Sequence, residues 1–145
     1  GQGHIIFLSG NKGCCPLSWT SNKIKRKVAS TLSAETLALS DALDEAIYIN
    51  AVLSETIYDT GENKLNISAF IDNKSLYDNV LSTKQVQEKR LRINIAEIRR
   101  MKEQKEVKEI VWIDTKQQQA DVMTKRGVDS QPLIDIVNTG NFITM

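Results

Sequence analysis

The first part of the chain alternates apolar and polar positions with the period of a β-strand. Residues 4–9 (HIIFLS) fit one strand, and residues 16–21 (PLSWTS) fit a second, in which Leu17 and Trp19 alternate with polar neighbours. The run GNKG at residues 10–13 lies between them and suits a tight turn. We therefore expect an antiparallel β-hairpin at the start of the chain.

Two later segments have the period of an α-helix. The first covers roughly residues 33–55 and can be capped at its start by Thr31 or Ser33. Its apolar residues recur at steps of three and four and should face the core: Leu39, Ala42, Ala46, Ile49 and Leu53. The second covers residues 86–104, with Leu91, Ile95 and Ile98 inward. Its other face is basic: Lys89, Arg90, Arg92, Arg99, Arg100 and Lys102.

Two short apolar runs, residues 67–71 (ISAFI) and 110–113 (IVWI), predict strands that are covered on both faces. A short helix over residues 73–81 should follow the first run. Two more, over residues 117–125 and 132–138, should follow the second. This order predicts one α/β domain, with a mixed sheet, helices on both of its faces and right-handed crossovers.

Composition narrows the choice of function only modestly. A chain of 145 residues with 41% apolar and 26% charged residues fits a single globular domain. The net charge of +1 means that any nucleic-acid binding must depend on local basic patches. The apolar runs are too short to cross a membrane, and no signal peptide is recognisable. The adjacent Cys14 and Cys15 favour free thiols in a reducing compartment over a disulfide or a zinc site.

Three acids occupy places that differ from those of ordinary solvated carboxylates, and all three could converge near the same sheet edge. Asp72 follows a predicted buried strand, Glu35 lies in the first turn of a predicted helix, and Asp121 lies early in a late helix. Clustered carboxylates suit Mg²⁺ or Mn²⁺, and two such ions about 3.5–4 Å apart stabilise both oxygens of a phosphodiester displacement. Spacing leaves simpler roles open, because Glu35 could complement a helix dipole, Asp72 could be an N-cap and Asp121 could be solvated.

Five blocks of residues resemble those of one known family, in the same order and over nearly the whole chain. They are CCPLSWTSNK at 14–23, STLSAETLAL at 30–39, FIDNKSL at 70–76, EKRLRI at 88–93, and WIDT at 112–115 with ADVMTK at 120–125. Together they resemble the ribonuclease H domain at the end of copia-type retrotransposon polyproteins, the C-terminal domain of the reverse transcriptase. Asp114 replaces a proline of that pattern.

The resemblance implies a ribonuclease H-like fold that cuts the RNA strand of RNA–DNA hybrids with two Mg²⁺ or Mn²⁺ ions held by four acids. Glu35, Asp72 and Asp121 match three of these. The fourth belongs to a first, central strand, and only three residues precede residues 4–9 here. We therefore expect weak metal binding and impaired activity. The alternative is a catalytically inactive, domesticated or decayed copy that acts as a binding module.

The absent central strand leaves three arrangements open. A preceding segment could supply it, another chain could add it by β-augmentation, or the family's second strand could slide against its fourth in a four-stranded, inactive domain.

The resemblance also implies residues that contact the hybrid. Thr31, Ser33 and Asn73 would reach the minor groove and its 2′-hydroxyls, and Lys74 would contact a phosphate where the family often has an amide. A basic stretch beside the site could follow the phosphates: Lys23, Lys25, Arg26 and Lys27. The expected location is intracellular, in the cytoplasm or a virus-like particle, with the nucleus as an alternative, and no membrane partner is expected.

Overall fold

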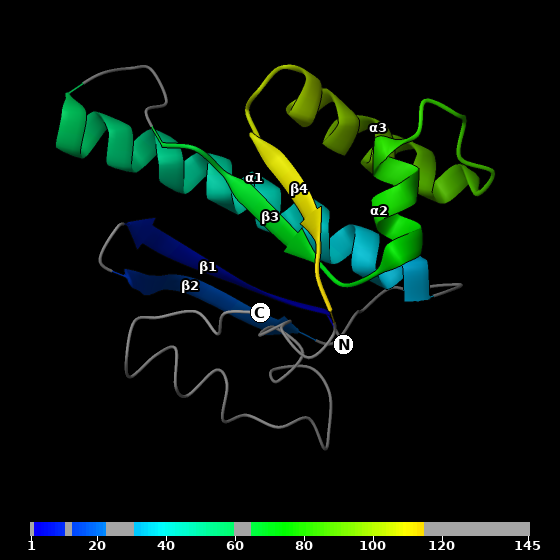
Figure 1. The fold of residues 1–145 in the computed structure, drawn as a ribbon, viewed down its shortest axis with the longest axis horizontal. Coiled ribbons are helices and arrows are strands. Elements are labelled where there is room, and N and C mark those ends of the chain that lie inside the picture. Colours follow the sequence, from blue (N-terminus) through cyan, green and yellow to red (C-terminus); the bar gives the residue numbers. More distant parts are fainter. Residues whose placement is uncertain (1, 11–12, 23–30, 60–64, 115–145) are drawn as a thin grey trace.

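The structure, a computed structural model, describes residues 2–10, 13–22, 31–59 and 65–114 (Figure 1). The elements in these residues are β1 (Gln2–Gly10), β2 (Gly13–Asn22), α1 (Thr31–Tyr58), β3 (Ser68–Ile71), α2 (Lys74–Leu81), α3 (Lys89–Glu103) and β4 (Glu109–Trp112). The helices predicted over 117–125 and 132–138 lie outside the described residues. Among the helices that are described, none combines the length and apolar character needed to span a membrane.

The predicted hairpin is confirmed. β1 and β2 pair antiparallel from Gln2 opposite Asn22 to Gly10 opposite Gly13. The register shifts at one point, because Ile6 lies opposite Ser18 whereas Phe7 lies opposite Pro16. A bulge is expected there, since proline cannot donate a ladder hydrogen bond.

The two large apolar residues of β2 lie on the surface. Leu17 and Trp19 are both exposed, and Trp19 retains 63% of its accessible area. Ser18, which lies between them, reaches Glu45 on α1. In β2, therefore, Ser18 faces the helix and its neighbours Leu17 and Trp19 face outward.

The second sheet consists of β3 and β4, which pair parallel from Ser68 opposite Glu109 to Ile71 opposite Trp112. We predicted one mixed sheet, but the described strands form two separate two-stranded sheets. Among the described residues, β1 and β3 each pair along one edge only, so the arrangement in which they slide together is not adopted. The mixed α/β content that we predicted is confirmed.

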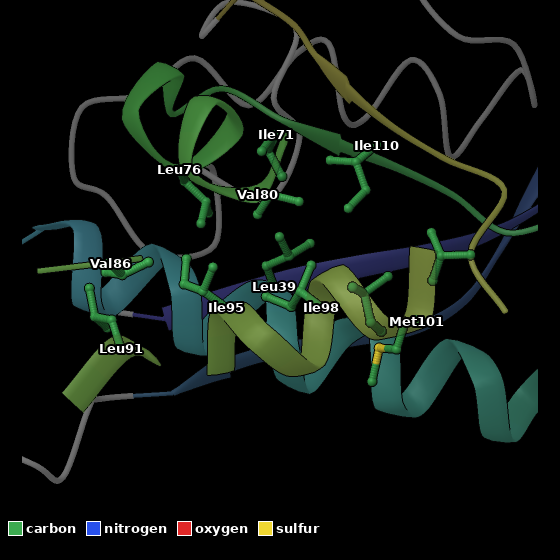
Figure 2. Close-up of a cluster of buried hydrophobic side chains, with 12 residues drawn as sticks. Leu39, Ile71, Leu76, Val80, Val86, Leu91, Ile95, Ile98, Met101 and Ile110 are labelled. Atoms are coloured by element: carbon green, nitrogen blue, oxygen red, sulfur yellow. The ribbon is translucent and has the colours of Figure 1, made fainter. Parts of the chain in front are cut away.

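The core lies between the β3–β4 sheet and the two long helices. Ile71 and Ile110 point from the sheet toward Leu39 of α1 and toward Ile95 and Ile98 of α3 (Figure 2). Burying each such side chain contributes about 1.5–3 kcal/mol relative to leaving it exposed. The remaining buried members of this cluster are Leu43, Leu76, Val80, Val86, Leu91, Met101 and Val107. The inward face predicted for α3 is therefore confirmed.

The inward face predicted for α1 is wrong by part of a turn. The four residues predicted to follow Leu39 are only half-buried: Ala42, Ala46, Ile49 and Leu53. The buried positions include four polar ones, Ser33, Thr36, Asn50 and Ser54. Burial of these groups is tolerated because each has hydrogen-bond partners.

The side chain of Asn50 takes part in three of the hydrogen bonds that allow polar groups to be buried on α1. Its Nδ2 donates to the Leu65 carbonyl at 2.8 Å, and its Oδ1 accepts from the Leu65 N–H at 3.2 Å and from the Ser54 hydroxyl at 3.1 Å. Thr36 Oγ1 donates to the Leu32 carbonyl at 2.7 Å. Asn50 thereby joins the second half of α1 to the segment that leads into β3.

The prediction that β3 and β4 are covered on both faces is also wrong. Phe70 retains 53% of its accessible area and Trp112 retains 46%. Side chains alternate along a strand, so Ile71 and Trp112 share the face toward the helices, whereas Phe70 lies on the opposite face. Within the described residues, α1 and α3 pack on one face only (Figure 2).

Candidate active site at the carboxyl ends of β3 and β4

Asp72 directly follows β3, and its neighbour performs the capping role that Asp72 might have had. Asn73 has an extended backbone, with φ −86° and ψ 107°, and its Oδ1 accepts from the Leu76 N–H at 2.9 Å. The N-cap of α2 is therefore Asn73, so the N-cap explanation of Asp72 is wrong. Asp72 is half-buried where the sheet ends and the helix begins.

Glu35 lies in the second turn of α1, because the helix begins at Thr31 rather than at residue 33. The first turn of α1 contains no acid. Since a helix dipole acts mainly on the first turn, this correction weakens the dipole explanation of Glu35. Figure 1 shows the start of α1, the carboxyl ends of β3 and β4, and the start of α2 at the same end of the molecule. Glu35 and Asp72 therefore come from elements that meet at one end.

The described residues contain two of the three acids that we predict to bind a metal, Glu35 and Asp72. They contain no group of three or more His, Cys, Asp or Glu side chains placed to share an ion. The third predicted acid, Asp121, lies outside the described residues. Glu35 and Asp72 are half-buried carboxylates, and carboxylate oxygens are the kind of ligand that Mg²⁺ uses together with water and substrate phosphates.

Lys74 begins α2 beside Asp72 and is exposed. Its Nζ lies 3.3 Å from Asp78 Oδ1, 5.0 Å from the centre of the Tyr77 ring and 5.6 Å from the centre of the Trp112 ring. Trp112 Nε1 donates to the Asp72 carbonyl at 3.2 Å. Lysine, tyrosine and tryptophan thus gather at the surface next to Asp72.

Sequence reasoning missed both aromatic residues of this group. Tyr77 follows Lys74 by three positions, which is a spacing that brings helical side chains together and could have been noticed. Trp112 could not have been found in this way, because it lies beside Asp72 only through the pairing of β4 with β3.

The other predicted contacts with nucleic acid fall into three groups. Asn73 uses its side-chain oxygen in the α2 cap. Ser33 is 6% exposed and its hydroxyl donates to Glu88 Oε1 at 3.2 Å, so a contact with a ligand would require this hydroxyl to move. The Thr31 side chain and the basic stretch predicted to follow phosphates lie outside the described residues: Lys23, Lys25, Arg26 and Lys27.

A second polar group joins the hairpin to α1 and was not predicted. His4 Nε2 lies 2.6 Å from Glu45 Oε2, and the Ser18 hydroxyl donates to Glu45 Oε1. These hydrogen bonds, first that of Ser18 and then that of His4, lower the pKa of the Glu45 carboxyl. The carboxylate stands between serine and histidine, so the histidine does not activate the serine as a nucleophile. We interpret this group as a structural attachment.

Comparisons with known proteins do not identify a family for this chain. No protein-family model, no curated protein and no solved structure matches the chain. The assignment of a function therefore depends on the residues and their arrangement.

Proposed function

We propose that this chain is the ribonuclease H domain of a retrotransposon reverse transcriptase, which hydrolyses the RNA strand of RNA–DNA hybrids. The observation that carries the proposal is the placement of Asp72 at the carboxyl end of β3, with the α2 cap assigned to Asn73. Glu35 comes from the start of α1 at the same end (Figure 1). The five blocks of family-like residues add support, because they include both acids.

In this proposal the two described acids provide ligands for a divalent cation. Such an ion would activate water and stabilise the charge that develops on the phosphate. Glu35 and Asp72 would hold the ion and orient the attacking water, and Asp121 would complete the acid set by resemblance. Lys74, exposed beside Asp72, would hold a neighbouring phosphate.

The proposal includes an added strand between the two sheets. β1 and β3 each have one edge without a strand partner among the described residues, and β1 is the strand of the hairpin nearer to β3 in Figure 1. Unpaired backbone groups at such edges are stabilised when an extended segment pairs with them. A preceding segment of a longer polypeptide, or another chain, would fill this position and supply the missing aspartate.

Cleavage of a fluorescent RNA–DNA hybrid with Mg²⁺ or Mn²⁺ tests the proposal. The wild-type chain and the chain extended by an upstream aspartate-containing strand are compared with their Asp72→Asn and Glu35→Gln variants. We expect weak cleavage without the strand, stronger cleavage with it, and loss of cleavage in both variants. Glu55→Gln is the matched control, because Glu55 is exposed near the far end of the same helix as Glu35. Cleavage that survives Asp72→Asn would disprove the assignment.

A second candidate is a catalytically inactive binding module. It is favoured by the finding that the described residues contain no group of three metal-binding side chains. This candidate predicts that the chain binds the hybrid in a fluorescence anisotropy titration, that added metal does not change the affinity, and that the extended chain does not cleave.

A further inference from the structure

Trp112 is an exposed aromatic residue whose orientation is determined by its neighbours. It is the last residue of β4, which has one described strand partner and so forms an edge of the sheet. Its position opposite Ile71 places it on the same face as the core. The ring nevertheless retains 46% of its accessible area.

Two interactions hold the indole in place beside Asp72. Its Nε1 donates to the Asp72 carbonyl at 3.2 Å, and the Lys74 ammonium lies over its ring at 5.6 Å. The same ammonium lies 5.0 Å from the Tyr77 ring, within the range of cation–π attraction for both rings. Rotation of the indole would break both interactions, so the ring presents a fixed exposed surface.

A fixed aromatic surface next to an exposed lysine has the features of a binding site for an unpaired nucleotide. Aromatic side chains bind unstacked bases by stacking, and lysines bind the accompanying phosphate. Bases inside a duplex already stack on one another, so only a terminal or unpaired base is available. Lys74 favours an anionic ligand, although Asp78 at 3.3 Å offsets part of its charge.

We propose that Trp112 stacks on an unpaired base of a single strand that continues from the hybrid, while Lys74 binds the adjacent phosphate. This inference rests on the proposed function, because it takes the ligand to be the nucleic-acid substrate of the site at Asp72. It goes further by assigning a base-stacking residue and by predicting a preference for hybrids that carry a single-stranded overhang.

The chain offers a matched control. Phe70 is an aromatic residue of the same sheet with a similar exposed fraction, 53%, but it lies on the opposite face. A general effect of exposed aromatic surface would therefore appear equally in Phe70→Ala and Trp112→Ala.

The experiment uses the full chain and two fluorescent RNA–DNA hybrids, one blunt and one with a short single-stranded RNA overhang. Anisotropy titrations are made in Ca²⁺ to prevent cleavage. We expect Trp112→Ala to weaken binding of the overhang hybrid by about tenfold. Its affinity for the blunt hybrid should stay within about twofold of the wild-type value. Trp112→Phe should retain most of the affinity, Phe70→Ala should change neither, and Lys74→Gln should weaken both and reduce their salt dependence.

A spectroscopic signal keeps the test valid if Trp112→Ala does not fold. The chain has two tryptophans, so Trp19→Phe leaves Trp112 as the sole reporter. Its emission should be quenched by the overhang hybrid and little changed by the blunt one. Three results would overturn the stacking proposal alone. They are an equal loss of affinity for both hybrids in Trp112→Ala, an equal loss of affinity in Phe70→Ala, and no quenching of Trp112 emission by the overhang hybrid. Failure of the wild-type chain to bind either hybrid would overturn this proposal and the proposed function together.

Discussion

The hairpin and the β3–β4 layer both pack on α1, but they do so with different chemistry. The hairpin is attached through a polar group in which Glu45 of α1 accepts from His4 and Ser18. The β3–β4 layer is attached through apolar side chains, among them Ile71 and Ile110. The hairpin instead exposes Trp19, which in an ordinary sheet would be a candidate for the core.

The two attachments should therefore have different roles, one in positioning the hairpin and the other in stabilising the fold. The stabilisation from apolar burial is proportional to the area that is buried, so it tolerates small shifts of the packed elements. A carboxylate bound by two donors requires a defined geometry. The β3–β4 layer should therefore provide most of the free energy of unfolding, and the Glu45 group should determine where the hairpin lies. Trp19 and Trp112 report on the two regions separately, in Trp112→Phe and Trp19→Phe backgrounds respectively.

The largest effect should come from the apolar layer. Ile98→Ala removes a fully buried side chain of α3 and should lower the free energy of unfolding by about 2–5 kcal/mol. Urea denaturation followed by circular dichroism measures this. Ile93→Ala on the same helix is the control, because Ile93 is 79% exposed and should change stability by no more than about 0.5 kcal/mol. Similar losses from both variants would contradict the assigned core.

A smaller effect should follow from the buried amide that joins α1 to the segment before β3. Asn50→Ala leaves the Leu65 backbone groups without their partner and should cost about 1–3 kcal/mol. The same denaturation experiment applies, with the exposed Glu55→Ala as a control on the same helix. An unchanged midpoint would show that water replaces the amide there.

The hairpin attachment should contribute less and should depend on pH. Glu45→Gln removes the charge that accepts two hydrogen bonds and should lower stability by about 1 kcal/mol near neutral pH. The effect should appear in Trp19 emission before it appears in Trp112 emission. If both signals change together, the two regions unfold as one unit.

The sign of the pH dependence follows from the lowered pKa of Glu45. The folded protein holds this carboxyl deprotonated more strongly than the unfolded chain does, so its contribution is complete above the ordinary glutamate value of 4.5. The contribution is lost as the pH falls through the lower folded pKa. Denaturation midpoints of the wild-type and Glu45→Gln chains should therefore converge at acid pH, and a constant difference would contradict the assigned cause.

The smallest effect should come from a surface ion pair. Arg100 Nη2 contacts Glu97 Oε1 at 2.5 Å, and this hydrogen bond lowers the pKa of Glu97. Both side chains are partly exposed, so water and salt screen the pair. Glu97→Gln should leave the urea midpoint unchanged within error, and a clear loss would contradict the expected screening of the pair.

Much of the local structure was predictable from spacing. The alternation in residues 4–9 and 16–21 and the glycines at 10 and 13 sufficed for the hairpin, because period-two alternation and a tight turn are local properties. The inward face of α3 followed from the spacing of Leu91, Ile95 and Ile98. The position of Asp72 at the end of a strand was predictable for the same reason.

The buried face of α1 was not predictable from hydrophobicity, because Asn50 is buried through hydrogen bonds to Leu65 outside the helix, and Ser54 through a hydrogen bond to Asn50. The same limit applies to the site. Lys74 was recognisable from its neighbours in sequence, whereas Trp112 joins it only through the pairing of β3 with β4.

By itself, then, the sequence determined the order and type of the described elements and the positions of Glu35 and Asp72 at element ends, since turn chemistry and periodicity act over a few residues. Only the tertiary structure decided that the strands form two sheets, that polar groups attach the hairpin, and that an indole lies beside Asp72. Those outcomes depend on contacts between residues about forty positions apart, such as Asp72 with Trp112 and His4 with Glu45. Such contacts are selected by the packing of the whole chain, and no local pattern encodes them.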